Sequence, residues 1–467
     1  MLNQSIVNEV LDEALAKGGD FAELFVENNR KESIVMRNGV IEDSVSGIDY
    51  GCGLRIFDGF NCVYAYTNDT SKESLIKLAK DAGAVIKNKK NTGDTREIII
   101  NRVYEGKEIN NIHKVEIQPF DIIKKEKAEM LRIAHNASKE YDKSVTQTIN
   151  GFMSGAQNIL VVNSDGLWAE DTRVRGRMTA QAVASSETEK QVGYLGPGSL
   201  SGFEYFKNLD IKALGREAAR IAVTMLKAEL CPSGLMPVII DNGFGGVIFH
   251  EACGHSLEAT SVAKGGSVFC GKLGEQIAAP RVTAVDDGTI PNAWGSCNID
   301  DEGNITQKNI LIENGVLKSY LVDRLNGRKM KMRPTGSGRR ESYKYAPTSR
   351  MTNTFIANGS SSPEDIIANT EYGLYAKKMG GGSVEPATGE FNFAVLEGYI
   401  VRNGKIAEPV RGATLIGKGS EVLMNIDMVG NNLARSQGMC GSSSGSVPTD
   451  VGQPMIRVKE ITVGGRK

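Results

Sequence analysis

Histidine is scarce in this 467-residue chain, which has four histidines, and none of its seven cysteines forms a CxxC motif. An odd number of scattered cysteines argues against a disulfide framework and favours a reducing compartment, so we expect the cytoplasm. No apolar run approaches the roughly 18 residues that a membrane helix needs, and the N-terminus lacks the basic start and apolar run of a signal peptide. The formal net charge of −1 lacks the basic excess that nucleic-acid binding normally leaves.

The length of the chain predicts two or three domains. Helical periodicity occurs in four segments of the first half, at residues 3–17, 72–88, 120–138 and 211–229. Alternating, strand-like segments separate the first helix from the second and the third from the fourth. The order helix, strands, helix therefore occurs twice, which we interpret as an internal duplication.

The second half of the chain is mainly strand-like. The segment CPSG at 231–234 breaks the fourth helix, and beyond it we expect only two short helices, near 247–258 and at 363–369. Asn-Gly pairs, a strong hairpin signal, stand at 38–39, 314–315 and 403–404. We predict an α+β fold with an N-terminal α+β domain over 1–118, a middle α+β domain over 119–230, and a C-terminal, mainly antiparallel β domain over 231–467.

Two histidines stand five positions apart in VIFHEACGHSLEA at 247–259. On a regular helix each residue advances about 100°, so His250 and His255 would lie about 140° apart and could not share one ion. Gly254 has no Cβ and would let the helix widen or end early, so that both rings converge. A regular helix would instead align Glu251, His255 and Glu258 on one face, as metal ligands or as a polar stripe. Hydrogen-bonded histidines in a buried helix are the third interpretation.

A third ligand is needed if both histidines bind a metal. A catalytic zinc takes three protein ligands and leaves the fourth position to water. The other histidines, His113 and His135, lie in the first half without ligand spacing. Cys440 is a candidate because its segment, QGMCGSSSGSV, reads as a Gly/Ser loop whose N–H groups and hydroxyls would orient a thiolate. Cys253 and Glu258 are the competing candidates.

A series of motifs extends over nearly the whole chain. The first half contains SGIDYGCGLRIFDG and AYTND; the second contains FHEACGHSLEA, SVFCGKLGEQIA, DDEGN, GSGRRESYKYAPTSRMTNTFI, ATGEFNF, GATLIGKG, DMVGN and MCGSSSGSVPTDVGQPMIRV. In this order they resemble the TldD/PmbA family, once named for modulation of DNA gyrase and regarded as metalloproteases, and its TldD branch in particular. The resemblance implies that His250, His255 and Cys440 bind zinc and that Glu251 is the general base. It favours the distorted helix and leaves Glu258 as a supporting residue.

The segment GRRESYKYAPTSR is rich in hydrogen-bond donors. Stabilisation of a tetrahedral oxyanion needs such donors, so the candidates for that role or for substrate binding are Arg339, Arg340, Tyr343 and Arg350. A solvated basic loop is the alternative. The family resemblance implies that this segment lines the catalytic cavity.

These features predict a zinc-dependent metallopeptidase. The resemblance implies cleavage of short or unfolded polypeptides inside an enclosed dimer cavity, and we expect a homodimer or a heterodimer with a paralogue that lacks the metal motif. A metal-dependent hydrolase of a small substrate would use the same site. A further alternative is a non-catalytic modulator that binds a protein such as gyrase through a fold with a structural metal. Structural zinc sites have four protein ligands, so three good candidates favour a catalytic site.

Overall fold

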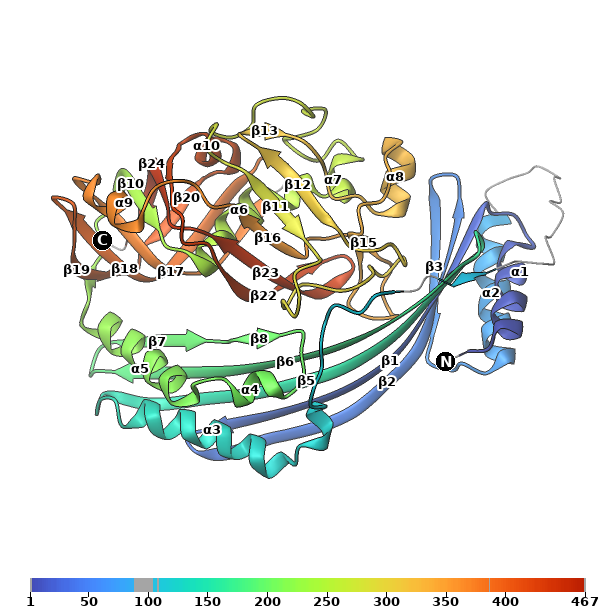
Figure 1. Cartoon of the computed structure of the whole chain (residues 1–467), viewed down its shortest axis with the longest axis horizontal. Helices are drawn as coiled ribbons and strands as arrows, with labels where there is room; N and C mark the ends of the chain where they lie inside the picture. The colour runs from blue at the N-terminus through green and yellow to red at the C-terminus, as the bar shows by residue number, and fades with distance from the viewer. Residues whose placement is uncertain (1, 88–103, 107–108, 386, 466–467) are drawn as a thin grey trace.

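The computed structural model describes residues 2–87, 104–106, 109–385 and 387–465 (Figure 1). One long, curved sheet underlies the first half, and two shorter sheets form most of the second half. This arrangement confirms the predicted α+β fold. The predicted order of helix, strands and helix is also present twice in the first half.

Strands from residues 1–118 and 119–230 share the first sheet. Its order is β3-β2-β1-β5-β6-β4, with β7 and β8 also against β6. β1 and β5 pair antiparallel along almost their whole length, so the two halves of the duplication meet at the centre of the sheet. The bounds are β1 (Phe21–Arg37), β2 (Val40–Asp58), β3 (Asn61–Thr67), β4 (Glu105–Gly106), β5 (Val145–Asn163), β6 (Leu167–Ser185), β7 (Lys190–Leu195) and β8 (Gly198–Ser199).

The helices of the first half cover one face of this sheet. They are α1 (Gln4–Leu15), α2 (Lys72–Lys87), η1 (Pro119–Asp121), α3 (Lys124–Lys139), α4 (Glu204–Lys207) and α5 (Ile211–Lys227). Successive strand residues point to opposite faces. Leu24 packs with α1 and α2 and Ile34 with α3 and α5, whereas Phe25 packs against Tyr343 of the second half. The sheet therefore lies between a helical layer and the C-terminal half (Figure 1).

All three Asn-Gly pairs form the predicted hairpin turns. Asn38 and Gly39, between β1 and β2, have φ values of 49° and 80°, and the pairs at 314–315 and 403–404 are also left-handed at both residues. Such backbone angles match the twist of the flanking strands. No helix in the described part of the chain combines the length and the apolar character that crossing a membrane requires.

Two sheets of the C-terminal half enclose the largest hydrophobic core. The order of one is β17-β10-β24-β20-β18-β19-β9, with β21 beside β24, and that of the other is β13-β12-β11-β16-β23-β22. Most pairs are antiparallel, as predicted; β10–β17, β9–β19 and β16–β23 are parallel.

The strand bounds of the C-terminal half are β9 (Glu229–Leu230), β10 (Gly234–Ile240), β11 (Ala284–Asp287), β12 (Lys308–Glu313), β13 (Val316–Leu317), β14 (Gly338–Arg339), β15 (Thr348–Ser349), β16 (Asn353–Ile356), β17 (Tyr372–Glu385), β18 (Glu390–Arg402), β19 (Lys405–Arg411), β20 (Thr414–Lys418), β21 (Ile426–Val429), β22 (Ala434–Ser442), β23 (Gly445–Gln453) and β24 (Ile456–Gly464). The helices are η2 (Gly243–Gly246), α6 (Val247–Ala252), η3 (Gly254–Leu257), α7 (Ala259–Val262), α8 (Arg324–Met330), α9 (Pro363–Ala368) and α10 (Gly419–Met424).

Buried ion pairs join the first sheet to the C-terminal half. Arg55 of β2 bridges Glu23 at 2.8 Å and Glu302 at 2.7 Å, and Arg173 of β6 pairs with Asp301 at 2.7 Å. A charge buried without its partner costs several kcal/mol, so these pairs must form together. They hold the turn at 300–304 against the sheet at a fixed spacing.

Candidate metal centre

The helix that carries the first histidine ends before the second. α6 stops at Ala252, Cys253 has φ −130° and ψ −47°, and the 3-10 turn η3 begins at Gly254. The prediction that the helix would be distorted at Gly254 is thus confirmed, and the regular-helix alternative is wrong. A Cβ at Gly254 would lie 2.3 Å from Met351 Sδ, so close packing against Met351 requires glycine there.

The break brings three candidate ligands together. Cys440 Sγ lies 3.2 Å from His250 Nε2 and 3.2 Å from His255 Nε2. One ligand atom from each of these three residues lies within 4.8 Å of the other two. His250 and Cys440 are buried, and His255 is largely buried. Two imidazole nitrogens and a thiolate are ligands that zinc prefers, so the donor set fits a zinc ion.

Cys440 lies on a strand, although its composition predicted a loop. It is the seventh residue of β22 and pairs with Val447 of β23. The Gly/Ser content was misleading because tertiary pairing with β23 supplies the stability that the residues themselves lack. Arg350, fully buried, donates to the carbonyl oxygens of Cys440 and of Gly445, the latter at 2.9 Å. It therefore ties both strands of the hairpin together beside the thiol.

Charge favours the ligating form of the thiol. Burial alone raises the pKa of Cys440, but the charges and hydrogen bonds of the His250 and His255 rings outweigh it and lower the pKa to about 3. Burial lowers the pKa of His255, and the Glu258 carboxylate, with Cys440, raises it well above its usual value. The lowered pKa of Cys440 favours the thiolate, which is the form of cysteine that ligates a metal ion.

Two carboxylates flank His255. Glu258 Oε2 lies 3.1 Å from His255 Nδ1, which leaves Nε2 directed at Cys440. Such a contact fixes the tautomer and the ring orientation of a ligating histidine. Glu251 Oε2 lies 3.6 Å from His255 Nε2, and 24% of the Glu251 side chain is exposed. Glu251 is thus beside the ligand atoms and reachable from solvent, as a general base must be.

Family models match three parts of the chain. The PmbA/TldA metallopeptidase domain 1 matches residues 22–86, the central domain 117–226 and the C-terminal domain 233–465. The chain belongs to the PmbA/TldD metallopeptidase family. The C-terminal match contains the three candidate ligands and Glu251.

Relatives that match this PmbA/TldD member over nearly its whole length are described as metalloproteases. A metalloprotease TldD homologue of Buchnera aphidicola subsp. Acyrthosiphon pisum is 36% identical over 481 residues, covering 100% of this chain and 98% of that protein. One of Haemophilus influenzae is 36% identical over 471 residues, covering 99% and 96%. A solved structure from Thermotoga maritima, described as a proposed modulator of a DNA gyrase, has a TM-score of 0.80, 22% identity and coverage of 99% and 100%. That likeness shows the fold.

The four donor candidates of the segment 339–350 have different partners in this PmbA/TldD fold. Arg350 contacts the Cys440 strand, as described, and Arg339 donates to the Met351 carbonyl at 2.6 Å. Arg340 pairs with Glu23 of the first sheet at 2.8 Å, and the Tyr343 hydroxyl donates to Asp49 at 2.9 Å. All four are buried. Arg340 and Tyr343 therefore hold the sheet against the C-terminal half, and contact with an oxyanion stays a prediction for each candidate.

The histidines outside the motif lie away from the metal centre. His113 is buried and its Nδ1 accepts from the Asn292 N–H at 3.1 Å; His135 Nδ1 lies 2.7 Å from Thr148 Oγ1. Neither contact involves a residue of the metal centre.

Sequence reasoning missed the contacts that the first sheet makes with the C-terminal half. Arg173, Arg175 and Arg177 occupy alternate positions of β6 and all contact the C-terminal half. Arg175 donates to the carbonyl oxygens of Trp294 at 3.0 Å and Ser296 at 2.6 Å. Arginines with period two in RVRGR indicate a charged, covered sheet face, and this signal was available in the sequence.

Proposed function

We propose that this PmbA/TldD member is a zinc-dependent metallopeptidase that hydrolyses peptide bonds in short or unfolded polypeptides. The observation that carries the proposal is the convergence of His250, His255 and Cys440 next to the accessible carboxylate of Glu251. In the described part of the chain, the group of possible ligands around Cys440 has three members, the number typical of catalytic zinc sites.

Each residue of the centre has a distinct task. His250, His255 and Cys440 would hold zinc, which when bound acidifies water and polarises a carbonyl oxygen. Glu258 orients His255 through Nδ1. Glu251 accepts the proton of the attacking water on a carboxylate oxygen and delivers it to the nitrogen of the leaving amine.

We propose that cleavage takes place inside an enclosed cavity of a homodimer, or of a heterodimer with a paralogue that lacks the metal motif. The support for this assembly is the family resemblance, and the enclosure would limit cleavage to chains that can enter unfolded. Analytical ultracentrifugation of active protein tests it, and a stable, active monomer would contradict it. All seven cysteines are free thiols, which supports placement in the cytoplasm.

Peptidase activity is tested with an unstructured peptide mixture. Zinc-loaded protein and its Glu251→Gln variant, matched for zinc content, are incubated with the mixture, and mass spectrometry identifies new termini. We expect new termini only with the unaltered protein. If both samples leave the peptides intact with zinc bound, the non-catalytic modulator with a structural metal is the better description.

A further inference from the structure

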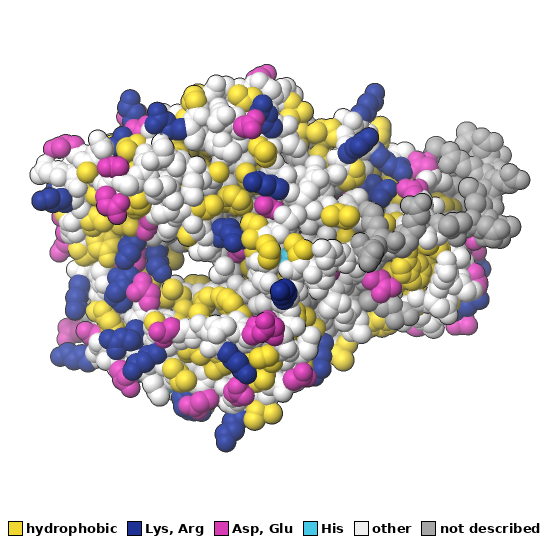
Figure 2. Space-filling model, in the orientation of Figure 1, with side chains coloured by type: hydrophobic (Ala, Val, Ile, Leu, Met, Phe, Trp, Pro, Cys, Tyr) yellow, Lys and Arg dark blue, Asp and Glu magenta, His cyan; other side chains and the backbone are white. Residues whose placement is uncertain are grey.

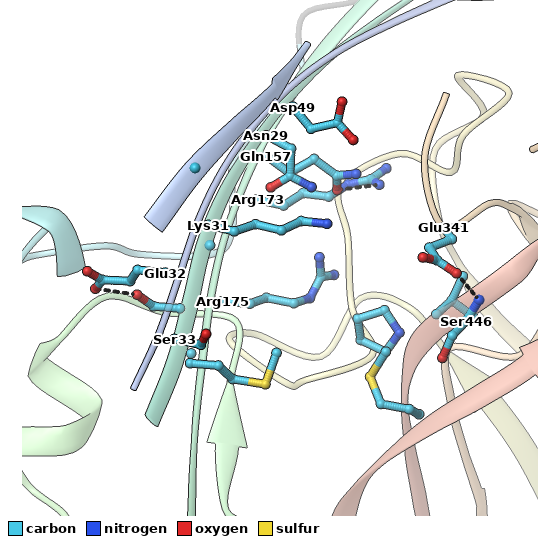
Figure 3. A pocket seen from close by; sticks show the side chains of 18 of the residues that line it. Asn29, Lys31, Glu32, Ser33, Asp49, Gln157, Arg173, Arg175, Glu341 and Ser446 are labelled. Carbon is cyan, nitrogen blue, oxygen red and sulfur yellow. Dashed lines mark hydrogen bonds between the residues drawn. The ribbon is translucent and has the colours of Figure 1, made fainter. Parts of the chain in front are cut away.

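A cavity lies between the first sheet and the β22–β23 hairpin. Its volume is about 580 Å³, a size typical of ligand sites. Figure 2 shows the molecule hollowed between the C-terminal half and the sheet, with hydrophobic side chains along the lower edge. The side chains that matter for its chemistry are Lys31 and Arg175, which Figure 3 labels, together with Arg339, Ile48, Met153 and Met439.

Neighbouring residues of β22 face the cavity and the metal centre. Met439 and Cys440 are successive residues of β22, so their side chains point to opposite sides. Cys440 faces the two histidines and is buried, whereas Met439 lines the cavity and is 49% exposed. The two sites share a wall but no ligand atom.

Three cations of the cavity, Lys31, Arg175 and Arg339, form no close ion pair with a carboxylate of the described residues. Lys31 of β1 projects into the space, and Arg175 of β6 projects beside it (Figure 3). The hydrogen bonds of Arg175 go to backbone carbonyls, and that of Arg339 goes to the Met351 carbonyl. Carbonyl acceptors orient a guanidinium but carry no full negative charge, so Asp171 near Arg175 and Asp301 near Arg339 compensate these cations only through space.

The carboxylates of the lining are mostly neutralised elsewhere. Asp49 pairs with Lys344 at 2.9 Å and Asp301 with Arg173 at 2.7 Å. Glu32 points away from the cavity (Figure 3), and its ion-pair partner is Lys127 of α3. Glu341 accepts from the Ser446 N–H at 2.7 Å and is the one lining carboxylate, in the part of the chain that the structure describes, without a cationic partner. The cavity therefore has an excess of positive charge.

The shape of the cavity suits an extended chain. β3 pairs with β2 only from Cys52 to Asp58, so the outer edge of β2 before Cys52 meets no other strand of the described residues. Ile48 and Asp49 point to opposite faces of β2, yet both line the cavity, which thus reaches around this edge. Unpaired strand edges bind peptides through backbone hydrogen bonds, and Met153, Met439 and Ile48 supply apolar contact.

We propose that this cavity binds a carboxylate group of an extended peptide, with Lys31 and Arg175 as its counter-charges. The group is either the C-terminal carboxylate or an acidic side chain of the peptide. This inference rests on the proposed function for the peptide nature of the ligand, and it adds a preference for acidic or free C-terminal substrates.

Peptide binding measured by fluorescence anisotropy tests the proposal. The probes are N-terminally labelled peptides of one neutral sequence in three forms: with a free C-terminal carboxylate, with a C-terminal amide, and with a C-terminal amide and one internal glutamate. The protein is the full-length, zinc-loaded Glu251→Gln form, and mass spectrometry confirms that the probes stay intact. Lys31→Gln and Lys31→Arg are compared with Lys190→Gln, which removes an exposed lysine of β7.

We expect the parent protein and the Lys190→Gln and Lys31→Arg forms to prefer at least one carboxylate probe over the neutral amide by about fivefold to tenfold, and Lys31→Gln to lose that preference. Preference for the free C-terminus alone identifies the main-chain carboxylate, and preference for the glutamate probe alone identifies the side chain. Equal binding of all three probes to the parent protein, or equal losses in Lys31→Gln and Lys190→Gln, would overturn the proposal.

Failure of this inference is distinct from failure of the proposed function. Carboxylate-dependent binding without cleavage by zinc-loaded unaltered protein would remove the peptidase and leave the cavity assignment. Cleavage at equal rates for the three probes, with equal binding, would retain the peptidase and remove the cavity assignment.

Discussion

At the scale of single residues, the His255 ring contacts three other residues of the centre: Cys440, Glu251 and Glu258. Its Nδ1 contacts Glu258, and its Nε2 faces both the Cys440 thiol and the Glu251 carboxylate. A ring with one nitrogen fixed by a carboxylate presents the other to a metal in a single orientation. Glu258 would therefore act on a bound metal through His255.

Glu258→Gln tests this positioning role. The amide retains an acceptor for His255 Nδ1 but removes the negative charge, so we expect zinc affinity to fall about tenfold. Competition with a chromogenic chelator measures it. Glu251→Gln is the matched control on the same motif and should retain the parent affinity. Unchanged zinc affinity in Glu258→Gln would contradict the role.

Gly254→Ala tests the break between α6 and η3. The new Cβ would lie 2.3 Å from Met351 Sδ in a fully buried contact, so we expect a loss of about 1–3 kcal/mol in unfolding free energy and a lower zinc content. Urea unfolding and metal analysis measure both. Gly441→Ala on β22, where a Cβ meets nothing within 4 Å, is the control. Equal effects of the two substitutions would rule out the steric explanation.

At the scale of elements, the β22–β23 hairpin supplies the thiolate, and Arg350 holds the hairpin. The Arg350 guanidinium also donates a hydrogen bond to Ser444 Oγ at 3.0 Å, near the turn between β22 and β23. Arg350→Met would leave buried carbonyl oxygens without this donor, so we expect the unfolding free energy to fall by about 1–3 kcal/mol.

We also expect faster amide hydrogen exchange across the hairpin in Arg350→Met, with reduced zinc binding. Hydrogen-exchange mass spectrometry of peptides covering 434–453 measures it. Arg435→Met, a partly exposed arginine of the same hairpin, is the control and should leave exchange near 440 unchanged. If the amides of Arg350→Met exchange as slowly as those of the parent protein, strand pairing alone holds Cys440 in position.

Elements with a local cause were predictable from the sequence. The predicted helix 72–88 is α2 at Lys72–Lys87, because apolar periodicity alone determines it, and Asn38-Gly39 turns the first hairpin because few other pairs accept its backbone angles. The β1–β5 pairing joins residues more than a hundred positions apart, and no local pattern specifies such a partner. β22 was missed for the same reason, since its stability comes from β23.

The sequence predicted the part of the metal centre that the histidine spacing constrains. It could not predict contacts that depend on how distant segments pack together. His250 and His255 could converge only through a break at Gly254, and the structure has that break. Arg340 and Tyr343 share a donor-rich segment with Arg350, but their partners Glu23 and Asp49 lie in the first sheet. Composition cannot distinguish a donor that faces a substrate from one that joins two layers.

At the scale of the whole molecule, buried polar contacts join the first half to the second, and His113 is one of them. Burial lowers the pKa of His113 to about 4; nearby Asp171 opposes this shift, and Arg175 adds to it. Its Nδ1 accepts from the Asn292 N–H only in the neutral form. In the unfolded chain the same ring titrates near its ordinary value of about 6.5.

This difference predicts acid sensitivity of the whole fold. Above about pH 6.5 the ring is neutral in both states and the His113 contribution is complete; as the pH falls from about 6.5 to about 4, the unfolded state takes up a proton first and stability is lost. His113→Gln keeps an acceptor for Asn292 but does not titrate. We expect its unfolding free energy to fall less than that of the parent between about pH 8 and about pH 5, as measured by urea unfolding. Subtracting the two pH profiles cancels other titrating groups, and parallel profiles would place the acid-sensitive contact elsewhere.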